Sequence, residues 1–201
     1  QNGENDTLIF EMGYLLDVSE DGNFMLFANS GAVKRYNFST VTLDDISIET
    51  YAAKFTSDAS SIIYASQTEL FIYNIDSQEN IMISDSLSYE TNFDYSAINN
   101  SVVFYEQNDI VTYNLLNSEK IVLSDNAMSL IGDGFSYLSW SPSNYIYYEC
   151  SGSVGGYDEV PQICIVLSDG NSPSEQSTNE FKFLLAPISS FSMQEKVVIS
   201  E

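Results

Sequence analysis

The chain contains no histidine, and this absence removes several functions at once. Its 201 residues include 2 cysteines and only 6 lysines and arginines together. Without histidine, the chain cannot assemble a Ser-His-Asp or Cys-His catalytic arrangement, and it lacks the commonest metal ligand. Two cysteines alone are too few soft ligands for a zinc site. We therefore expect no catalytic residues, no bound metal and no cofactor.

Several other signatures are also missing. There is no Gly-x-Ser-x-Gly nucleophile elbow and no glycine-rich phosphate loop. No apolar run approaches the roughly 20 residues of a membrane-spanning helix, so we expect no membrane insertion. Apolar residues recur at period two or in short runs rather than at the helical period, which predicts a chain without long helices.

Positive charge is scarce. The chain has 29 acidic residues against 6 basic ones, for a formal net charge of −23. This field repels phosphate backbones and anionic membrane surfaces, so we expect no nucleic-acid partner. The excess can be a solubility device in a salty medium that screens self-repulsion. Alternatively, it indicates a partner with a basic surface, or divalent cations held around the protein.

What the chain has in abundance is β-forming residues. Hydrophobic residues make up 44% of the sequence, with 14 Tyr and 12 Phe among them, a composition typical of strands. The length suffices for one domain with a sizeable core. We therefore treat residues 1–201 as a single all-β domain.

A Tyr-Asn strand recurs along this domain. Lys34-Arg-Tyr-Asn-Phe38 matches Phe71-Ile-Tyr-Asn-Ile75 and then Val111-Thr-Tyr-Asn-Leu115, at spacings of 37 and 40 residues. A polar turn and an apolar strand precede each copy. Two of the copies are followed by nearly identical strands, Asn80–Asp85 and Lys120–Asp125. A period of about 40 residues with four short strands is typical of a β-propeller blade.

The repeats predict the organisation of the whole chain. We expect a propeller of four-stranded blades, with five blades and a ring closed by an N-terminal strand at residues 7–12. The alternative is part of a six- to eight-bladed propeller. The predicted repeats span residues 15–51, 52–87, 92–128, 137–179 and, in part, 181–201.

The fourth repeat carries a family resemblance. Trp140-Ser-Pro-Ser-Asn144, Ile146-Tyr-Tyr148 and the run from Ile163 to Pro173 resemble the repeat of TolB-like propellers, and Ser19-Glu-Asp-Gly22 keeps the Asp-Gly of its turn. The resemblance implies a non-catalytic protein-binding or scaffold module of an exported or cell-envelope protein, periplasmic or extracellular, whose oligomeric state stays open. Two alternatives remain: an accessory propeller of a prolyl-oligopeptidase-like peptidase, and a carbohydrate-active propeller.

The two cysteines lie in this fourth repeat. Aligned with the second repeat, Cys150 and Cys164 replace Ser66 and Phe71, and 14 residues separate them instead of 5. They would then face each other across the base of an enlarged hairpin loop, which suits a disulfide. Such a bridge indicates an oxidising compartment. Two free buried thiols are the alternative.

Three charged residues are candidates for a binding site in the central channel. Asp17, Lys54 and Asp94 align with Ser139 and Leu184 on the first strands of the repeats, which line the channel of a propeller. Paired carboxylates could serve a glycosidase. They can equally be ordinary polar residues in a wet channel.

Another candidate contact surface is the enlarged loop, Ser151 to Gln162, with Tyr157, Asp158 and Glu159, because loops on rigid scaffolds often carry binding function.

Two further patterns favour structural roles. Asp17-Val-Ser-Glu-Asp-Gly22 resembles the start of a calcium loop, but the twelfth position is Ala28 rather than a bidentate acid. We therefore interpret it as a turn. The repeated tyrosines Tyr36, Tyr73 and Tyr113 are expected to pack between blades.

Overall fold

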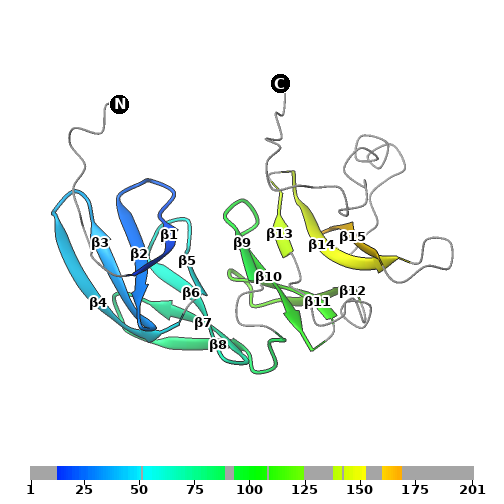
Figure 1. Cartoon of the computed structure of the whole chain (residues 1–201), viewed down its shortest axis with the longest axis horizontal. Coiled ribbons are helices and arrows are strands. Elements are labelled where there is room, and N and C mark those ends of the chain that lie inside the picture. Colours follow the sequence, from blue (N-terminus) through cyan, green and yellow to red (C-terminus); the bar gives the residue numbers. More distant parts are fainter. Residues whose placement is uncertain are drawn as a thin grey trace, which may run out of the picture.

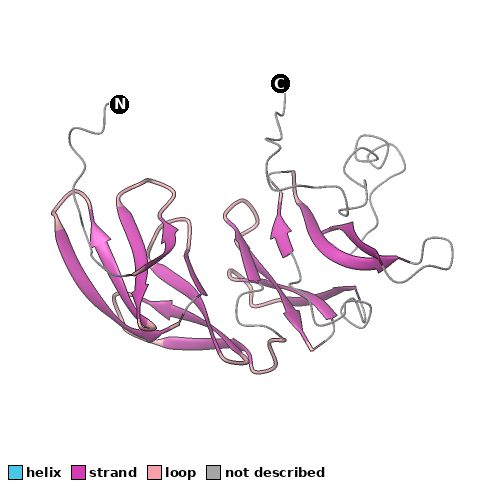
Figure 2. Cartoon of the chain, viewed as in Figure 1, coloured by secondary structure: helices cyan, strands magenta, loops and turns pink. Residues whose placement is uncertain are grey.

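In this computed structural model, the chain folds into strands and turns. The structure describes residues 13–50, 52–88, 93–107, 109–124, 138–141, 143–152 and 160–168, apart from the side chains at 124, 149–152 and 160–163. Every regular element in these ranges is a strand, as Figure 2 shows. No helix in this part of the chain could span a membrane.

Within the described residues, fifteen strands form four antiparallel sheets, each from consecutive segments of the chain. The first sheet contains β1 (Tyr14–Val18), β2 (Phe24–Asn29), β3 (Ala32–Asn37) and β4 (Thr42–Glu49). The second contains β5 (Ala52–Phe55), β6 (Ser61–Ser66), β7 (Glu69–Asn74) and β8 (Asn80–Ser84). The third contains β9 (Phe93–Ser96), β10 (Ser101–Glu106), β11 (Asp109–Asn114) and β12 (Lys120–Ser124). The fourth contains β13 (Leu138–Trp140), β14 (Tyr145–Gly152) and β15 (Val160–Leu167).

The first strand of each sheet lies toward the middle of the molecule. In Figure 1, β1, β5, β9 and β13 gather centrally, and β4, β8 and β12 lie toward the periphery. Strand β1 lies beside β5, and β9 lies beside β13, whereas β5 and β9 approach each other less closely. Side chains of these four strands can therefore meet across neighbouring sheets.

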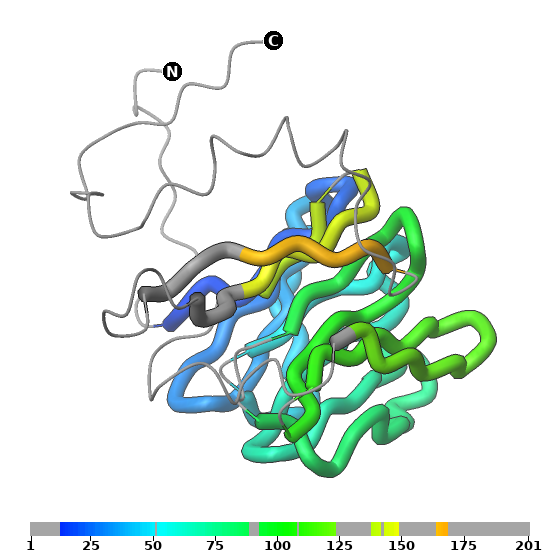
Figure 3. Tube along the Cα trace, turned by 90° about the vertical axis from the view of Figure 1, so that its right-hand side faces the viewer, coloured from blue at the N-terminus to red at the C-terminus, as the bar shows by residue number. Residues whose placement is uncertain are grey.

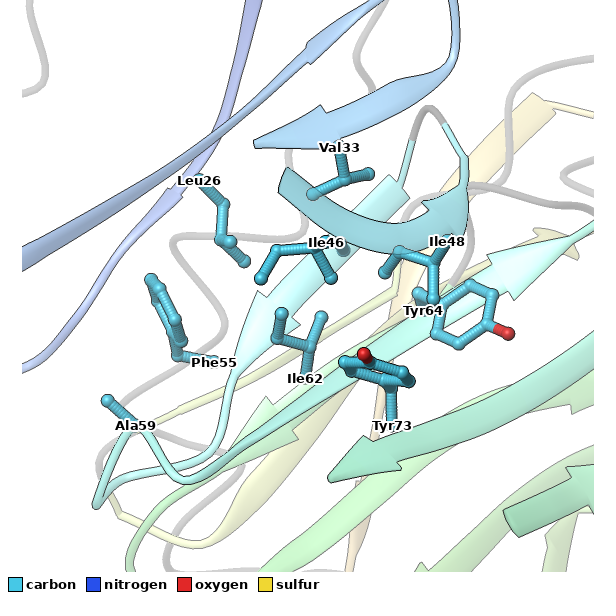
Figure 4. Close-up of a cluster of buried hydrophobic side chains, with 10 residues drawn as sticks. Leu26, Val33, Ile46, Ile48, Phe55, Ala59, Ile62, Tyr64 and Tyr73 are labelled. Carbon is cyan, nitrogen blue, oxygen red and sulfur yellow. The ribbon is translucent and has the colours of Figure 1, made fainter. Parts of the chain in front are cut away.

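Apolar side chains fill the space between successive sheets. In the first of these clusters, Leu26, Val33 and Ile46 of the first sheet meet Ile62 and Tyr73 of the second (Figure 4). A second cluster joins the second and third sheets, and a third joins the third and fourth. Since a single four-stranded sheet cannot bury both faces alone, this stacking supplies the core.

The polar repeats of the sequence form the turns. The hydroxyl of Ser19 accepts the Phe24 N–H at 2.9 Å, and that of Thr56 accepts the Ser61 N–H at 3.1 Å. The asparagine of each Tyr-Asn pair caps the next turn, where its side-chain oxygen accepts backbone N–H groups two or three residues later. Short polar side chains that bond to their own backbone favour turns, so the local sequence defines where each strand ends.

The structure confirms the all-β fold and the four-stranded antiparallel sheets; the fourth sheet has three strands within the described residues. The described parts of β14 and β15 lie side by side (Figure 3). Their ladder continues to Gly152 opposite Val160, so the ends of the segment predicted as a loop are strand instead. Residues 7–12 and the fifth repeat lie outside the described residues. The number of blades, the ring closure and the limits of the domain therefore stay predictions.

Candidate functional site

The predicted channel residues lie on the innermost strands. Asp17 is on β1, Lys54 on β5, Asp94 on β9 and Ser139 on β13. The structure brings Lys54, Asp94 and Ser139 into direct contact and joins Asp17 to the backbone of β5. Leu184, aligned with them in sequence, lies outside the described residues.

Asp94 is the centre of this group. Its side chain is nearly buried, and its Oδ1 atom accepts the Lys54 ammonium at 2.5 Å and the Tyr95 N–H at 2.9 Å. Its Oδ2 atom accepts the Ser139 hydroxyl at 3.0 Å and the Trp140 N–H at 2.8 Å. Both carboxylate oxygens are thus engaged by several donors, which suits a structural carboxylate better than a proton-transfer group.

Asp17 makes the equivalent link between the first and second sheets. Its Oδ2 atom accepts the Phe55 N–H at 2.8 Å. Phe55 follows Lys54, and Trp140 follows Ser139, in the strands where Lys54 and Ser139 align with the two acids. Asp17 and Asp94 therefore bind the same backbone position of the next innermost strand. Each carboxylate is therefore a side-chain-to-backbone clamp between neighbouring innermost strands.

The second sheet has Lys54 at this position, and the contact changes accordingly. An ammonium group has no acceptor, so Lys54 cannot bind the Tyr95 N–H of the next sheet. It instead donates to the Asp94 carboxylate, which itself accepts that Tyr95 N–H. The long lysine side chain joins the two innermost strands that approach each other less closely.

Burial changes the acidity of Asp17. Desolvation raises the pKa of its carboxyl above the usual value of 3.8, and the negative charge of Asp94 adds to this rise. The backbone N–H groups of Phe55 and Val18 and the charge of Lys54 oppose it. Protonation of Asp17 is therefore easier in the folded chain than in an ordinary exposed aspartate.

The segment that resembles the start of a calcium loop forms a turn, as predicted from the lack of an acid at its twelfth position. Asp21 accepts the Ser19 hydroxyl at 2.7 Å and the Asn23 N–H at 2.9 Å, and these hydrogen bonds lower the pKa of its carboxyl. Asp17 points to the β5 backbone instead. Within the described residues, no three acidic or cysteine side chains are grouped to hold a metal ion.

Two of the repeated tyrosines pack between sheets. Tyr73 is buried in the first apolar cluster, and Tyr113 packs against the second. Tyr36 is half-buried and meets Phe38 edge-on, with ring centroids 5.1 Å apart. Tyr36 belongs to none of the three clusters between described sheets, so its predicted position between blades is not seen in the described part of the chain.

The strand register corrects the placement of the cysteines. Cys164 lies opposite Tyr148 and Cys150 lies opposite Gln162, so the two are offset by two residues rather than directly opposed. The alignment with Ser66 and Phe71 carried the same offset, since Ser66 pairs with Glu69. Cys164 is not a free thiol. The side chain of Cys150 lies outside the described residues, so the Cys150–Cys164 disulfide stays a prediction.

Tyr157, Asp158 and Glu159 lie outside the described residues, and their role stays a prediction.

Sequence reasoning also missed a polar link on the outer side of the second and third sheets. There, Glu106 accepts the Ser84 hydroxyl and the Lys120 ammonium, both at 2.5 Å. Nothing in the repeat pattern marks Glu106, because the contact depends on how the sheets stack.

The similarity of this chain to known proteins lies in its fold. No family model and no curated protein matches the sequence. Solved structures do match the fold, and they are propeller proteins. One is a TolB-like protein from Agrobacterium tumefaciens, with a TM-score of 0.60 and 15% identity over 83% of this chain and 63% of that one. Another is TolB from Acinetobacter baumannii, with a TM-score of 0.56 and 16% identity over 79% of this chain and 41% of that one.

An oligogalacturonate lyase from Vibrio parahaemolyticus has a similar structure, with a TM-score of 0.57 and 13% identity over 79% of this chain and 50% of that one. The chain therefore has a β-propeller fold, as predicted, and the fold is TolB-like. It spans less than two thirds of the length of these structures. Since propellers host both binding proteins and enzymes, the fold alone does not separate the two classes.

Proposed function

We propose that this chain is a non-catalytic protein-binding module of an exported or cell-envelope protein. The observation that carries the proposal is that the basic side chains of the described part are all paired, whereas acidic side chains are in large excess. All four basic residues of the described part, Lys34, Arg35, Lys54 and Lys120, are paired with acidic side chains. With 29 acids in the chain, the surface left for a partner is strongly negative. Such a surface favours a partner with a basic face and speeds encounter with it.

The inner site supports a binding or scaffold role rather than catalysis. Asp94 is held by four donors, and Asp17 is used as a clamp between sheets. The carbohydrate-active alternative needs two carboxylates free to act on substrate. An anionic polysaccharide, such as the one in the name of the lyase neighbour, would also be repelled by the acidic surface.

The peptidase alternative has one supporting neighbour. The tricorn protease matches with a TM-score of 0.56, 14% identity and coverage of 17% of its own chain. In that alternative, the chain would be an accessory propeller. A catalytic domain with a Gly-x-Ser-x-Gly elbow in the same gene product would favour it over our proposal.

The proposal is tested by chemical cross-linking of the tagged chain to envelope proteins, followed by identification and purification of the captured partner. We expect a basic partner whose affinity falls steeply with salt. The substitutions Tyr157→Ala and Glu159→Gln should weaken binding if the predicted loop contributes. Hydrolysis or cleavage of a glycan by the purified chain, lost in both Asp17→Asn and Asp94→Asn, would contradict the proposal.

The proposed location is periplasmic or extracellular, and the state of the cysteines tests it. We expect Cys150 and Cys164 to resist alkylation in the native chain isolated without reductant, and to take up two alkyl groups after reduction. Two groups taken up before reduction, with the chain unfolded, would show free thiols and remove this support for an oxidising compartment.

A further inference from the structure

The outer edges of the second and third sheets expose apolar side chains. Strands β8 and β12 are the end strands of their sheets, and no described strand pairs with their outer sides. Ile81 and Met82 on β8 are 54% and 53% exposed, and Ile121 and Val122 on β12 are 36% and 50% exposed. An edge strand also offers unpaired backbone N–H and C=O groups, so each edge is a template for a further strand.

The first sheet protects the same positions with charge. Asp44 lies opposite Arg35 on β3, as Ile81 lies opposite Ile72 and Ile121 opposite Thr112 in the next sheets. Asp44 forms an ion pair with Arg35, and the adjacent Asp45 pairs with Lys34. Charged residues on an edge strand are a common protection against unwanted pairing. At the positions of Asp44 and Asp45, β8 has Ile81 and Met82, and β12 has Ile121 and Val122, so these two edges lack that protection.

Both apolar edges are bounded by acids. Glu79 precedes β8 and Asp85 follows it. In the sequence, Glu119 precedes β12 and Asp125 follows it, and Lys120, the first residue of β12, is paired with Glu106. Glu79, Asp85 and Glu119 are all exposed. A strand that pairs along such an edge therefore meets apolar side chains in its middle and negative charge near its ends.

We propose that β8 and β12 bind extended segments of a partner protein by strand addition, each segment having an apolar centre with lysine or arginine at both ends. This rests on the proposed function and assigns it a surface. A second copy of the chain fits poorly. Antiparallel pairing of β8 with itself would place Glu79 near Asp85, and parallel pairing would align like acids, which is unfavourable.

The test uses a defined peptide rather than the unknown partner. The probe is a fluorescent peptide of alternating valine and threonine with two lysines at each end, and its binding is followed by anisotropy. Two control peptides carry glutamates at the ends or a central proline, which cannot complete a ladder. The protein variants are Ile81→Ser with Met82→Ser, and Ile121→Ser with Val122→Ser. The matched control is Leu43→Ser, an exposed apolar residue on the charge-protected β4 edge.

We expect the lysine-flanked peptide to bind, and each double substitution to weaken binding at its own edge by about tenfold or more. The Leu43→Ser chain should bind as the parent does. When the peptide is bound, the backbone amide protons of β8 and β12 should exchange more slowly with solvent deuterium. Contact through side chains alone would not slow this exchange. Folding of each variant is verified by its unfolding curve.

Three results would overturn the inference: no binding of the lysine-flanked peptide, equal binding of the proline peptide, or unchanged affinity in both double variants. The partner captured by cross-linking then separates the two proposals. If that partner still binds the double variants at full affinity, the protein-binding function stands and this surface is wrong. If no partner is captured although the peptide binds at these edges, the proposed function fails by itself.

Discussion

The junction between the first and second blades and the junction between the second and third join similar sheets by different means. At the first, the Asp17 carboxylate binds the Phe55 N–H of the next innermost strand. At the second, the Lys54 ammonium binds the Asp94 carboxylate instead, and on the outer side Glu106, which is paired with Lys120 of its own sheet, accepts the Ser84 hydroxyl of the second sheet. Apolar clusters fill both junctions. The second junction therefore includes an ion pair, which salt screens, where the first has a hydrogen bond to the backbone.

The junction between the third and fourth blades has the same arrangement as the first junction, since the Asp94 carboxylate binds the Trp140 N–H. Asp94 thus serves two junctions, and Lys54 and Asp17 serve one each. A repeat protein can therefore keep the same backbone stacking while one residue change converts a hydrogen-bonded junction into an ionic one. Four substitutions test this comparison.

Asp94→Ala should have the largest effect. It removes the shared acceptor, so the Trp140 N–H, the Ser139 hydroxyl and the Lys54 ammonium lose their partner. We expect a loss of about 2–4 kcal/mol in the free energy of unfolding, because buried donors are left unpaired. Urea unfolding measures it, with the exposed acid substitution Glu79→Ala as a control that should change little. A loss equal to the control would contradict the double role of Asp94.

Asp17→Ala should cost less, because it affects one junction. The buried Phe55 residue loses the acceptor of its backbone N–H, and we expect a loss of about 1–2 kcal/mol. Hydrogen exchange at the Phe55 amide should accelerate more than exchange in β10, which lies in another blade. An unchanged rate at Phe55 would show that the clamp contributes nothing.

Lys54→Met should cost less again. Lys54 is 41% exposed, so solvent screening limits the ion pair to about 1 kcal/mol or less. Asp94 keeps its other three donors. The difference from the parent should shrink in roughly 1 M NaCl, where charges are screened within about 3 Å. A difference that is independent of salt would mean that lost packing of the lysine stem, rather than charge, is measured.

Asp17→Asn tests the raised pKa of Asp17. A raised folded-state pKa means that protonated Asp17 stabilises the fold; this contribution is fully present below the unfolded pKa and is lost as pH rises through the folded pKa. Asparagine keeps a side-chain acceptor without the charge. We expect the variant to be at least as stable as the parent at neutral pH, with the difference disappearing at acid pH. A variant that is less stable at neutral pH and recovers at acid pH would reverse the sign.

The repeat in the sequence predicted the blades well, for a local reason. The Tyr-Asn strands and the hydroxyl-bearing turns are defined by contacts between residues close in sequence, such as the Ser19 hydroxyl with the Phe24 N–H. The alignment also predicted that Asp17, Lys54, Asp94 and Ser139 occupy equivalent innermost positions. It did not predict their partners, and it misjudged the register of Cys150 and Cys164 by two residues.

The exposed edges show the other limit of the sequence pattern. Asn80–Asp85 reads as an apolar strand, yet Ile81 and Met82 are exposed whereas Ile83 is buried. Apolar character alone does not distinguish an outer strand from a central one, because exposure depends on which strands pair on either side and on the bulge near Leu70.

By itself, the sequence determined the strands, the turns and the excess of negative charge, since these follow from each residue and its near neighbours. Tertiary structure decided which donors the acids bind, because those partners lie 38 to 46 residues apart and meet only when rigid sheets stack at a given distance. Tertiary structure also decided that β8 and β12 are the end strands of their sheets and expose apolar side chains to solvent. The pairing between strands, rather than composition, determines which side chains lie at an exposed edge.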